Sequence, residues 1–498
     1  MNAAGYRIAV AFMVSVALSG CMVGPDFVRP SPPQAQRYTE TPMPEATVAT
    51  PGIGGAAQRF VPGAELPAQW WALFRSSSLD DLIRQALSDS PTLAAAEAAL
   101  REANENLIAG KGELLYPAVD ANAAATRQKI SGAALGEPNL GSSLFTLYNA
   151  NVSVSYALDV FGGARRQVEG LQALVDYQAY LLEAAHLTLT SNIATTAIRE
   201  AGLRQQVRST QEIIAAQERQ LTVVQRQFTL GAVSRADVLA QRAQLEQTRA
   251  TLPPLERDLA QTRHRLAVLA GRLPSLAALP EFELEAITLP QEVPVSVPSS
   301  LVRQRPDILA SEALLHQASA QVGVATANLY PQITLTGSFG GQSTKLGDLF
   351  AGPSIWSIGA GLLQPLFHGG ALTAQRRAAI DAYDQAAAQY RQTVLLAFQN
   401  VADTLRALDD DARTLQAQAD AEAVARESLA LAQRQFELGA VSYLTLLNAQ
   451  RQYHLARILL TRAQADRYAD TAALFQALGG GWWQRQAAAE LPASTKSN

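Results

Sequence analysis

The sequence predicts a mainly α-helical protein with a transmembrane β portion, built from two copies of one unit. Residues 225–239 and 433–447 are identical at ten of fifteen positions, at a fixed offset of 208 residues. Each stretch lies between two long helical patterns, with Gly-Ala-Val-Ser at the bend. A composition rich in Ala, Leu, Gln and Arg and poor in aromatic residues favours long helices over a compact α/β enzyme. Two such hairpins in one chain indicate an internal repeat that organises the whole fold.

The N-terminus carries a short apolar run followed by the only cysteine of the chain. Arg7 gives a positive charge, residues 8–18 are apolar, and Leu-Ser-Gly precedes Cys21. The run is too short to cross a bilayer as a helix but suits a secretory signal at residues 1–20. Leu-Ser-Gly-Cys resembles the lipobox of bacterial lipoproteins, in which Cys21 becomes the acylated first residue, and Met22 implies sorting to the outer membrane. The alternative is an ordinary signal with a chance cysteine.

After Pro117 and Pro331, apolar residues recur with a period of two instead of about 3.6. Proline lacks a backbone donor and disfavours helix in the residue before it, so Tyr116 and Tyr330 end the preceding helices. The alternation predicts two β-hairpins, each with one apolar and one polar face. The expected polar face contains Asn122, Ser153, Ser155, Thr334, Thr336 and Ser338. Strands of this length and pattern match a transmembrane β-barrel better than a buried core.

One chain supplies only four such strands, and four strands cannot close a barrel. An open strand edge in hydrocarbon leaves backbone groups unsatisfied, at several kcal/mol each, so several chains must share one sheet. A dimer gives eight strands, whose interior side chains fill, and a trimer gives twelve. The polar inward residues favour the wet interior of a trimer. The alternative is a soluble β-sandwich that interrupts a coiled coil.

The predicted boundaries follow these patterns along the chain. After the signal at 1–20 we expect a lipid-anchored tether and equatorial segment at 21–75, a first repeat at 76–271, an equatorial connector at 272–300, a second repeat at 301–478 and a polar tail at 479–498. Inside the repeats we expect β-hairpins at about 117–160 and 331–367, and helical hairpins at about 164–270 and 371–478. The first long helix, of about 65 residues, spans about 100 Å at 1.5 Å per residue.

Charge and motif content exclude several classes of function. The net charge of −4 lacks the basic excess of a nucleic-acid binder. The five histidines lack the spacing of metal ligands, so no metal site is expected. The sequence contains no phosphate-binding glycine loop, nucleophile elbow or HExxH motif, so we expect neither an enzyme nor a cofactor.

Four motifs occur in a fixed order along the mature chain: Cys-Met-Val-Gly-Pro-Asp-Phe at 21–27, Trp70-Trp71-x-x-Phe74, the two Leu-Gly-Ala-Val-Ser bends, and Ala-Leu-Gly-Gly-Gly-Trp at 477–482. Together they resemble TolC-like outer-membrane efflux proteins, above all the NodT-type, OprM-like lipoproteins. The resemblance implies a trimeric 12-stranded outer-membrane β-barrel continuous with a long periplasmic helical (α-barrel) tunnel. It also implies the passive exit duct of a tripartite pump for drugs or other small toxic compounds, with a periplasmic adaptor (membrane fusion protein) and an inner-membrane transporter of the RND type.

The resemblance also implies functional residues. The adaptor is expected to dock at the two bends, here Leu230, Gly231, Val233 and Ser234, and Leu438, Gly439, Val441 and Ser442. The family closes its periplasmic end with Leu-x-x-Leu-Asp-Ala-Gln-Arg on the last helix. The matching gate residues here are Leu444, Asn448 and Arg451, which share one helix face, with Asn448 where the family often has Asp. The first repeat has alanine at all three positions. The alternative is that these residues merely pack between helices.

Two acidic features and the class of function leave further alternatives. Asp409–Asp411 would line an acidic lumen or form a solvated face, and Asp237 would contact the adaptor or cap its helix. Within the channel class, the alternative is an outer-membrane duct for type I protein secretion. From another class, the alternative is a lipid-anchored periplasmic scaffold or adaptor that never crosses the membrane. The four alternating strands count against that scaffold.

Overall fold

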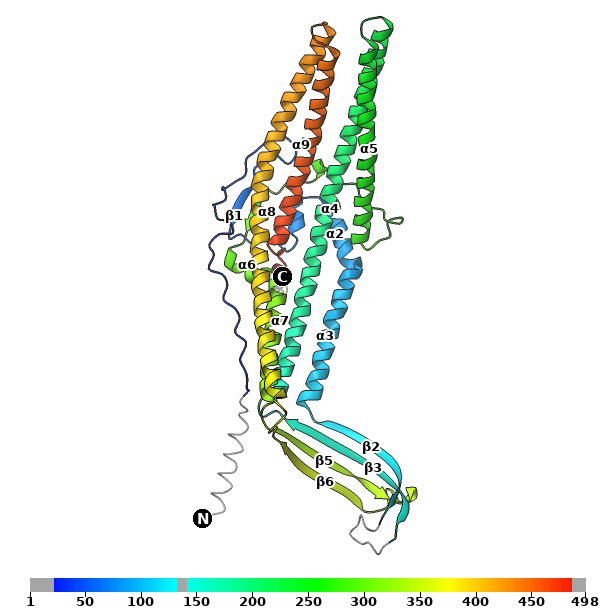
Figure 1. Cartoon of the computed structure of the whole chain (residues 1–498), viewed down its shortest axis with the longest axis vertical. Helices are drawn as coiled ribbons and strands as arrows, with labels where there is room; N and C mark the ends of the chain where they lie inside the picture. The colour runs from blue at the N-terminus through cyan, green and yellow to red at the C-terminus, as the bar shows by residue number, and fades with distance from the viewer. Residues whose placement is uncertain (1–21, 132–140, 486–498) are drawn as a thin grey trace, which may run out of the picture. The chain divides into compact units, whose positions relative to one another are not determined.

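The computed structural model describes residues 22–131 and 141–485, most of which lie in helices (Figure 1). The predicted signal, Cys21 and residues 486–498 lie outside the described residues. The chain divides into two units. One unit consists of Met1–Pro30, Ala99–Ala179 and Ala310–Arg391, and the other of Ser31–Ala98, Tyr180–Leu309 and Gln392–Asn498.

The order of elements in the first repeat recurs in the second. The first repeat contains α2 (Ser77–Asp89), α3 (Pro91–Leu115), β2 (Ala118–Ile130), β3 (Ser143–Leu158), α4 (Gly163–Thr229) and α5 (Arg235–Leu269). The second contains α6 (Pro298–Gln304), α7 (Pro306–Ala327), β5 (Gln332–Ser343), β6 (Ser354–Leu363), α8 (Ala371–Glu437) and α9 (Tyr443–Ala477). The long helices α4 and α8 have 67 residues each, and the return helices α5 and α9 have 35 each. The duplication therefore extends to the lengths of the long and return helices, whereas α2 and α6 have 13 and 7 residues and β3 and β6 have 16 and 10.

Caps and prolines set the ends of the helices. The Ser76 side chain accepts a hydrogen bond from the amide of Leu79 at 3.4 Å and so begins α2. Helix α3 ends at Leu115, just before the Tyr-Pro pair at Pro117, as the sequence predicts. Helix α7 likewise ends shortly before Pro331, and a strand follows in both repeats.

The four strands of the repeats form one curved antiparallel sheet in the order β2-β3-β5-β6 (Figure 1). The register places Ser153 opposite Ser338 and Ser155 opposite Thr336, so polar residues share one face. This confirms the predicted alternation, although the apolar Ile355 also lies on the polar face. Within the described residues, β2 and β6 are the two edges of this sheet.

A second, two-stranded sheet lies in the N-terminal segment that the sequence predicts as a tether. Here β1 (Arg59–Pro62) pairs in parallel with β4 (Glu292–Val295) of the connector. Both strands are four residues long and contain proline, so they carry no alternation that would predict them. This part of the segment is therefore folded against the rest of its unit.

A buried arginine of α9 holds the same segment. The Arg467 guanidinium donates to the carbonyl oxygens of Gly54 and Ala56 at 2.7 and 2.8 Å, and to the hydroxyl of Thr47 at 2.8 Å. Burial lowers the pKa of Arg467, and nearby acidic charge opposes that change. These hydrogen bonds fasten residues near the start of the chain to its last helix.

An aromatic cluster anchors the start of the first repeat. Trp70 and Phe74 in the 3-10 helix η1 (Trp70–Phe74) are fully buried, and the Trp70 ring lies 5.8 Å from that of Phe475, centroid to centroid. Among the described residues, no helix has a stretch that is both long and apolar enough to cross a membrane. The same residues contain no group of His, Cys, Asp and Glu side chains placed to hold a metal ion.

Candidate functional site

The two bends between long and return helices have the same backbone. Gly231 and Gly439 have φ angles of +73° and +70°, a left-handed conformation that glycine adopts without a Cβ penalty. One residue later, the amide donates to the carbonyl oxygen five residues earlier, at 2.9 Å for Ala232 and 2.8 Å for Ala440. These hydrogen bonds satisfy carbonyl groups at the end of each long helix and fix the direction of the turn.

A serine caps the return helix after each bend. The Asp237 amide donates to the Ser234 hydroxyl at 3.3 Å, and the Asp237 carboxylate accepts from the Ser234 amide at 2.9 Å. This reciprocal pair is a capping box, so Asp237 caps its own helix. At the second bend Ser442 accepts from the Thr445 amide at 3.3 Å, and no carboxylate takes part.

Each bend exposes one leucine. Leu230 is 78% exposed and Leu438 is 84% exposed. Val233 and Val441 are half-buried beside them. The predicted docking residues therefore lie at the surface of the chain, with an apolar side chain at the same place in each copy.

The predicted gate residues lie on one exposed row of α9. Leu444 is 60% exposed, and Asn448 and Arg451 are also exposed. Their neighbours Leu446 and Leu447 are buried on the other side of the helix. Within this chain, the three gate residues therefore do not pack between helices. Sequence reasoning missed a fourth exposed residue of the row, Leu455, four positions after Arg451.

Tyr443, just before the gate row, joins the two hairpins. Its ring is buried and lies 5.4 Å from that of Phe436, centroid to centroid. Its hydroxyl donates to the side-chain oxygen of Gln241 on α5. Burial raises the pKa of Tyr443, and the charge of Asp237 raises it further. Tyr443 also belongs to an apolar cluster containing residues of both hairpins, among them Val224 and Val233. Sequence reasoning missed this contact, since one tyrosine in a helical pattern gives no signal.

The acidic run on α8 divides into two environments. Asp409 and Asp410 pair with Arg413, one helical turn away. Asp411 instead faces α9, and burial raises its pKa to about 8, helped by the charge of Asp470 and a hydrogen bond with it. The run is therefore neither a uniform acidic lining nor a uniform solvated face.

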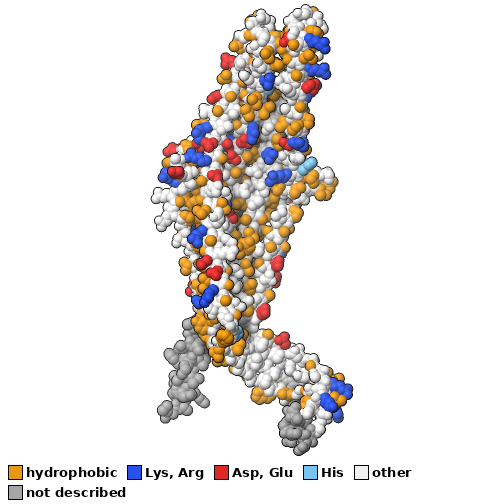
Figure 2. Space-filling model, viewed as in Figure 1, with side chains coloured by type: hydrophobic (Ala, Val, Ile, Leu, Met, Phe, Trp, Pro, Cys, Tyr) orange, Lys and Arg blue, Asp and Glu red, His pale blue; other side chains and the backbone are white. Residues whose placement is uncertain are grey.

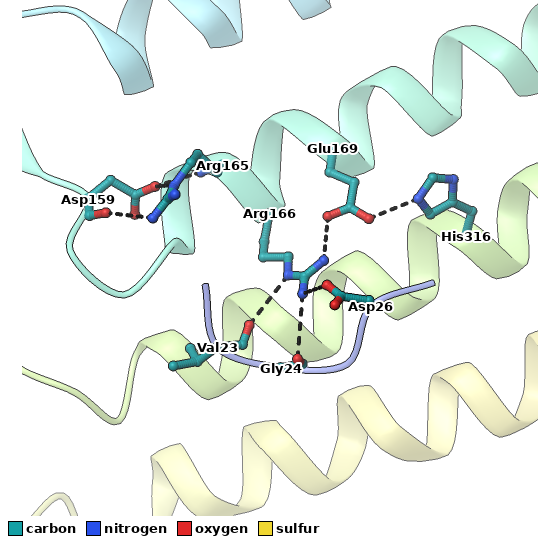
Figure 3. A network of polar contacts seen from close by, with 8 residues as sticks. All are labelled: Val23, Gly24, Asp26, Asp159, Arg165, Arg166, Glu169 and His316. Atoms are coloured by element: carbon teal, nitrogen blue, oxygen red, sulfur yellow. Dashed lines mark hydrogen bonds and ion pairs between the residues drawn. The ribbon is translucent and has the colours of Figure 1, made fainter. Parts of the chain in front are cut away.

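The N-terminal segment is held by a buried arginine of α4 (Figure 3). Arg166, with its side chain 1% exposed, donates to the carboxylate of Asp26 at 2.7 Å and to the carbonyl oxygens of Val23 and Gly24 at 3.4 and 3.5 Å. It also donates to the carboxylate of Glu169 at 2.7 Å. Burial alone lowers the pKa of Arg166, but Glu169 and Asp26 raise it above its usual value.

Helix α7 completes this site, and we call Arg166, Glu169 and His316 the N-terminal clamp (Figure 3). The His316 ring lies 2.9 Å from the Glu169 carboxylate, nitrogen to oxygen, and stacks on Phe27 with centroids 4.3 Å apart. A Cβ atom at Gly323 would lie 2.7 Å from the Arg166 side chain, so the close approach requires glycine. The clamp binds the N-terminal segment to both repeats.

Duplicated helical hairpins joined to a sheet with one apolar and one polar face define a class of outer-membrane channel proteins. The chain belongs to the outer membrane efflux protein family, which it matches over residues 82–272 and 297–480, one match in each repeat. This confirms the resemblance inferred from the four motifs.

Relatives match over nearly the whole chain. The chain is 32% identical over 451 residues to the pyoverdine export outer membrane protein OpmQ of Pseudomonas putida, covering 89% of this chain and 94% of the relative. It is 30% identical over 493 residues to the toluene efflux pump outer membrane protein TtgC of Pseudomonas putida, covering 96% of both. The solved structure of the outer-membrane channel OprN has a TM-score of 0.83 at 26% identity, covering 93% of this chain and all of that one. The chain is thus an outer-membrane efflux channel, and its relatives are channel and transport proteins.

Proposed function

We propose that three copies of this chain close one sheet and form the passive exit duct of a tripartite efflux pump. The observation that carries the proposal is the two-faced sheet, whose edges β2 and β6 are unpaired within the described chain. An unpaired edge in lipid costs several kcal/mol for each unsatisfied backbone group. Pairing β6 of one copy with β2 of the next satisfies both edges, and twelve strands leave room for a wet interior.

In this duct the bends and the row that follows the second bend have different roles. The bends at Leu230–Ser234 and Leu438–Ser442 dock the periplasmic adaptor, which links the duct to an inner-membrane transporter of the RND type. The exposed row of Leu444, Asn448 and Arg451 forms the periplasmic gate, where three copies bring three arginines together. Asn448 supplies no charge to neutralise Arg451, so the ring is positive and restricts passage by size and by charge.

Small organic compounds are the cargo that the comparisons favour. Two relatives are named for pyoverdine export and for toluene efflux, and both match most of the chain. A passive duct selects weakly, so the transporter sets most of the specificity. No particular contact in the described chain favours protein secretion.

The proposal for the anchor is that Cys21 carries acyl chains. The N-terminal clamp supports it, because it fixes the residues that directly follow Cys21. The amide of Val23 donates to the carbonyl oxygen of Phe161 at 3.1 Å, three residues after the end of β3. The described residues that follow Cys21 therefore lie at the helical end of the sheet, where a lipid leaflet would receive acyl chains.

The duct is tested with the purified full-length protein. Native mass spectrometry should give a complex of three copies, and the same preparation should conduct ions in planar bilayers. Cells that lack their own channel should regain drug resistance when they express this one with its adaptor and transporter. A stable monomer in the aqueous fraction without detergent would contradict the proposal.

The anchor needs a separate test. Mass spectrometry of the mature protein should find an acylated residue 21, and the Cys21→Ser variant should carry no acyl chain. Arg166→Met should leave acylation intact but expose residues 22–30 to protease. Arg165→Met is the matched control, because Arg165 pairs with Asp159 and does not touch the segment. Equal protease resistance in both variants would argue against the clamp.

A further inference from the structure

The apolar face of the four-stranded sheet becomes basic towards the loops that join its strands. Because side chains alternate along a strand, one face of β2 carries Val119, Ala121, Ala123, Ala125, Arg127 and Lys129 in that order. Lys345 lies two residues after Ser343, the last residue of β5, and Ser343 pairs with Tyr148 near the same end of the sheet. Figure 2 shows Lys and Arg side chains gathered at this loop end of the sheet.

A hollow of about 510 Å³ opens on the same face, beside this basic end. Its apolar lining includes Ala121, Ala123, Val152, Phe339, Leu349 and Phe350. The volume lies within the roughly 300–1,000 Å³ typical of small-molecule sites. Phe339 and Phe350 are both exposed although large and apolar. Such a surface suits an apolar ligand or hydrocarbon and not water.

The hollow is built by the loop after β5. This loop contains the 3-10 helix η4 (Leu346–Asp348) and returns across the sheet. A Cβ atom at Gly341 would lie 2.2 Å from the carbonyl oxygen of Leu349, so only glycine allows the loop to approach the strand this closely. Leu349 is buried by this approach, whereas Phe350 stays exposed at the side of the hollow.

The hollow and the basic residues lie at different depths along the strands. Arg127 follows Ala123 by four residues on β2, about 14 Å at 3.4 Å per residue. In a barrel strand tilted by about 45° this is about 10 Å along the membrane normal, which is less than the half-thickness of about 15 Å of the hydrocarbon core. The loops lie at the end of the sheet away from the helices, and the helices of an outer-membrane channel extend into the periplasm. The basic residues therefore lie at the headgroup level of the outer leaflet, and the hollow lies at acyl-chain depth.

We propose that this hollow and the three cations Arg127, Lys129 and Lys345 bind one phosphorylated, acylated lipid of the outer leaflet. An acyl chain occupies the hollow, and the phosphate groups face the cations. Arginine and lysine are the side chains that form charge-assisted hydrogen bonds to phosphate. In the described part of this loop end, Asp348 is the acidic residue, so cations exceed acids by three to one. The proposal requires the outer-membrane location but neither the gate nor the bends.

The test uses the purified full-length protein in detergent, titrated with bisphosphorylated lipid A and followed by native mass spectrometry. The wild type should retain the lipid. The triple variant Arg127→Gln, Lys129→Gln, Lys345→Gln should bind it at least roughly tenfold more weakly, about 1.4 kcal/mol. Lys111→Gln on α3, an exposed cation outside the sheet, is the matched control and should bind as the wild type does.

The ligand and the hollow are tested separately. Dephosphorylated lipid A should bind the wild type as weakly as the triple variant binds lipid A, and inorganic phosphate should not displace the lipid. Ala123→Trp, which fills the hollow, and Phe350→Ala, which removes its exposed aromatic side, should both weaken binding. Unchanged lipid binding in the triple variant, or in both hollow variants, would overturn the proposal.

Conductance of the same preparations separates this site from the channel itself. The triple variant should keep the wild-type conductance in planar bilayers while losing the lipid. A wild-type protein that binds the lipid without conducting would contradict the duct and leave the lipid site intact.

Discussion

The two helical hairpins have equal lengths and the same bend, but their return helices differ in burial. Within one chain α9 buries fifteen of its 35 residues, whereas α5 buries five of 35. Helix α5 also contains Pro253 and Pro254, where α9 has Thr461 and Arg462. Two adjacent prolines remove two backbone donors from a helix. The two copies therefore share the same backbone, but within one chain the return helix of the second copy is packed more tightly than that of the first.

The divergence begins directly after the bends. The first copy continues with the exposed Arg235 and Ala236, and the second with the buried Tyr443 and the exposed Leu444. The shared glycine turn points to a role common to both copies, such as docking. The differing residues point to roles confined to one copy: the proposed gate, which begins with Leu444, and the contact between hairpins that Tyr443 makes.

Replacement of the bend glycines should have the largest effect, because it tests what the two copies share. Gly231→Val or Gly439→Val places a β-branched residue in a left-handed backbone, at a cost of about 1–3 kcal/mol. Drug resistance should fall to the level of cells without the channel. Asparagine tolerates this conformation, so Gly231→Asn and Gly439→Asn are the controls. Full resistance in the valine variants, at normal trimer yield, would remove the bends from the docking model.

Substitution in the gate row tests a difference between the two copies, because the first copy has alanine at all three gate positions. Arg451→Ala should raise single-channel conductance in planar bilayers, because it removes a positive side chain from the proposed constriction of each subunit. The reverse change in the first copy, Ala243→Arg, should leave conductance unchanged. Equal conductance in Arg451→Ala and the wild type would count against the gate.

Substitution of Tyr443, which makes the contact between hairpins, should destabilise the region near the bends. Tyr443→Ala removes a buried aromatic side chain, and we expect a loss of about 3–5 kcal/mol near the bends. Tyr443→Phe leaves the side-chain oxygen of the buried Gln241 without its donor, and we expect this to cost about 1–3 kcal/mol of stability. Hydrogen exchange of amides in α5 and α9 measures both losses. Arg235→Ala, at the matching position of the first copy, should be nearly neutral, and similar effects at both positions would show that Tyr443 has no special role.

The smallest expected effect is a pH dependence of folding stability that arises in the second copy alone. Asp411 occupies the position of Leu203 in the first copy, and it faces Asp470, Asp466 and Arg467. Its pKa is about 8 when folded and about 4 when unfolded, so its contribution to stability is present below pH 4 and is lost as pH rises through 8.

Asp411→Asn removes this dependence. The melting temperature of the variant should exceed that of the wild type at pH 8.5, and the difference should shrink at pH 5. Asp410→Asn, exposed and one residue away, is the control. A difference between Asp411→Asn and the wild type that does not change with pH would contradict this assignment.

The bends and the faces of the sheet follow from the sequence because local rules decide them. Glycine at 231 and 439 marks a left-handed turn, Pro117 and Pro331 end helices, and a period of two separates apolar from polar faces. The exposed row of Leu444, Asn448 and Arg451 follows from helical periodicity in the same way.

The N-terminal clamp and the β1–β4 pair do not follow from the sequence because their partners are distant. Arg166 lies 140 residues from Asp26, and charged residues are usually exposed, so its burial has no local signal. The strand Arg59–Pro62 has only four residues and ends in proline, so it is too short to show a period of two. Both features depend on which surfaces meet after the helices pack.

The hydrogen bond between Arg467 and Thr47 joins residues 420 positions apart. A chain that emerges from its N-terminus first cannot close this contact until almost all of it has arrived, and contacts between remote residues form slowly. The segment from Thr47 to Ala56 is thus made early but is among the last parts of the chain to become fixed. A chain that stops short of its final helix keeps that part loose, which marks it as incomplete to any protease nearby.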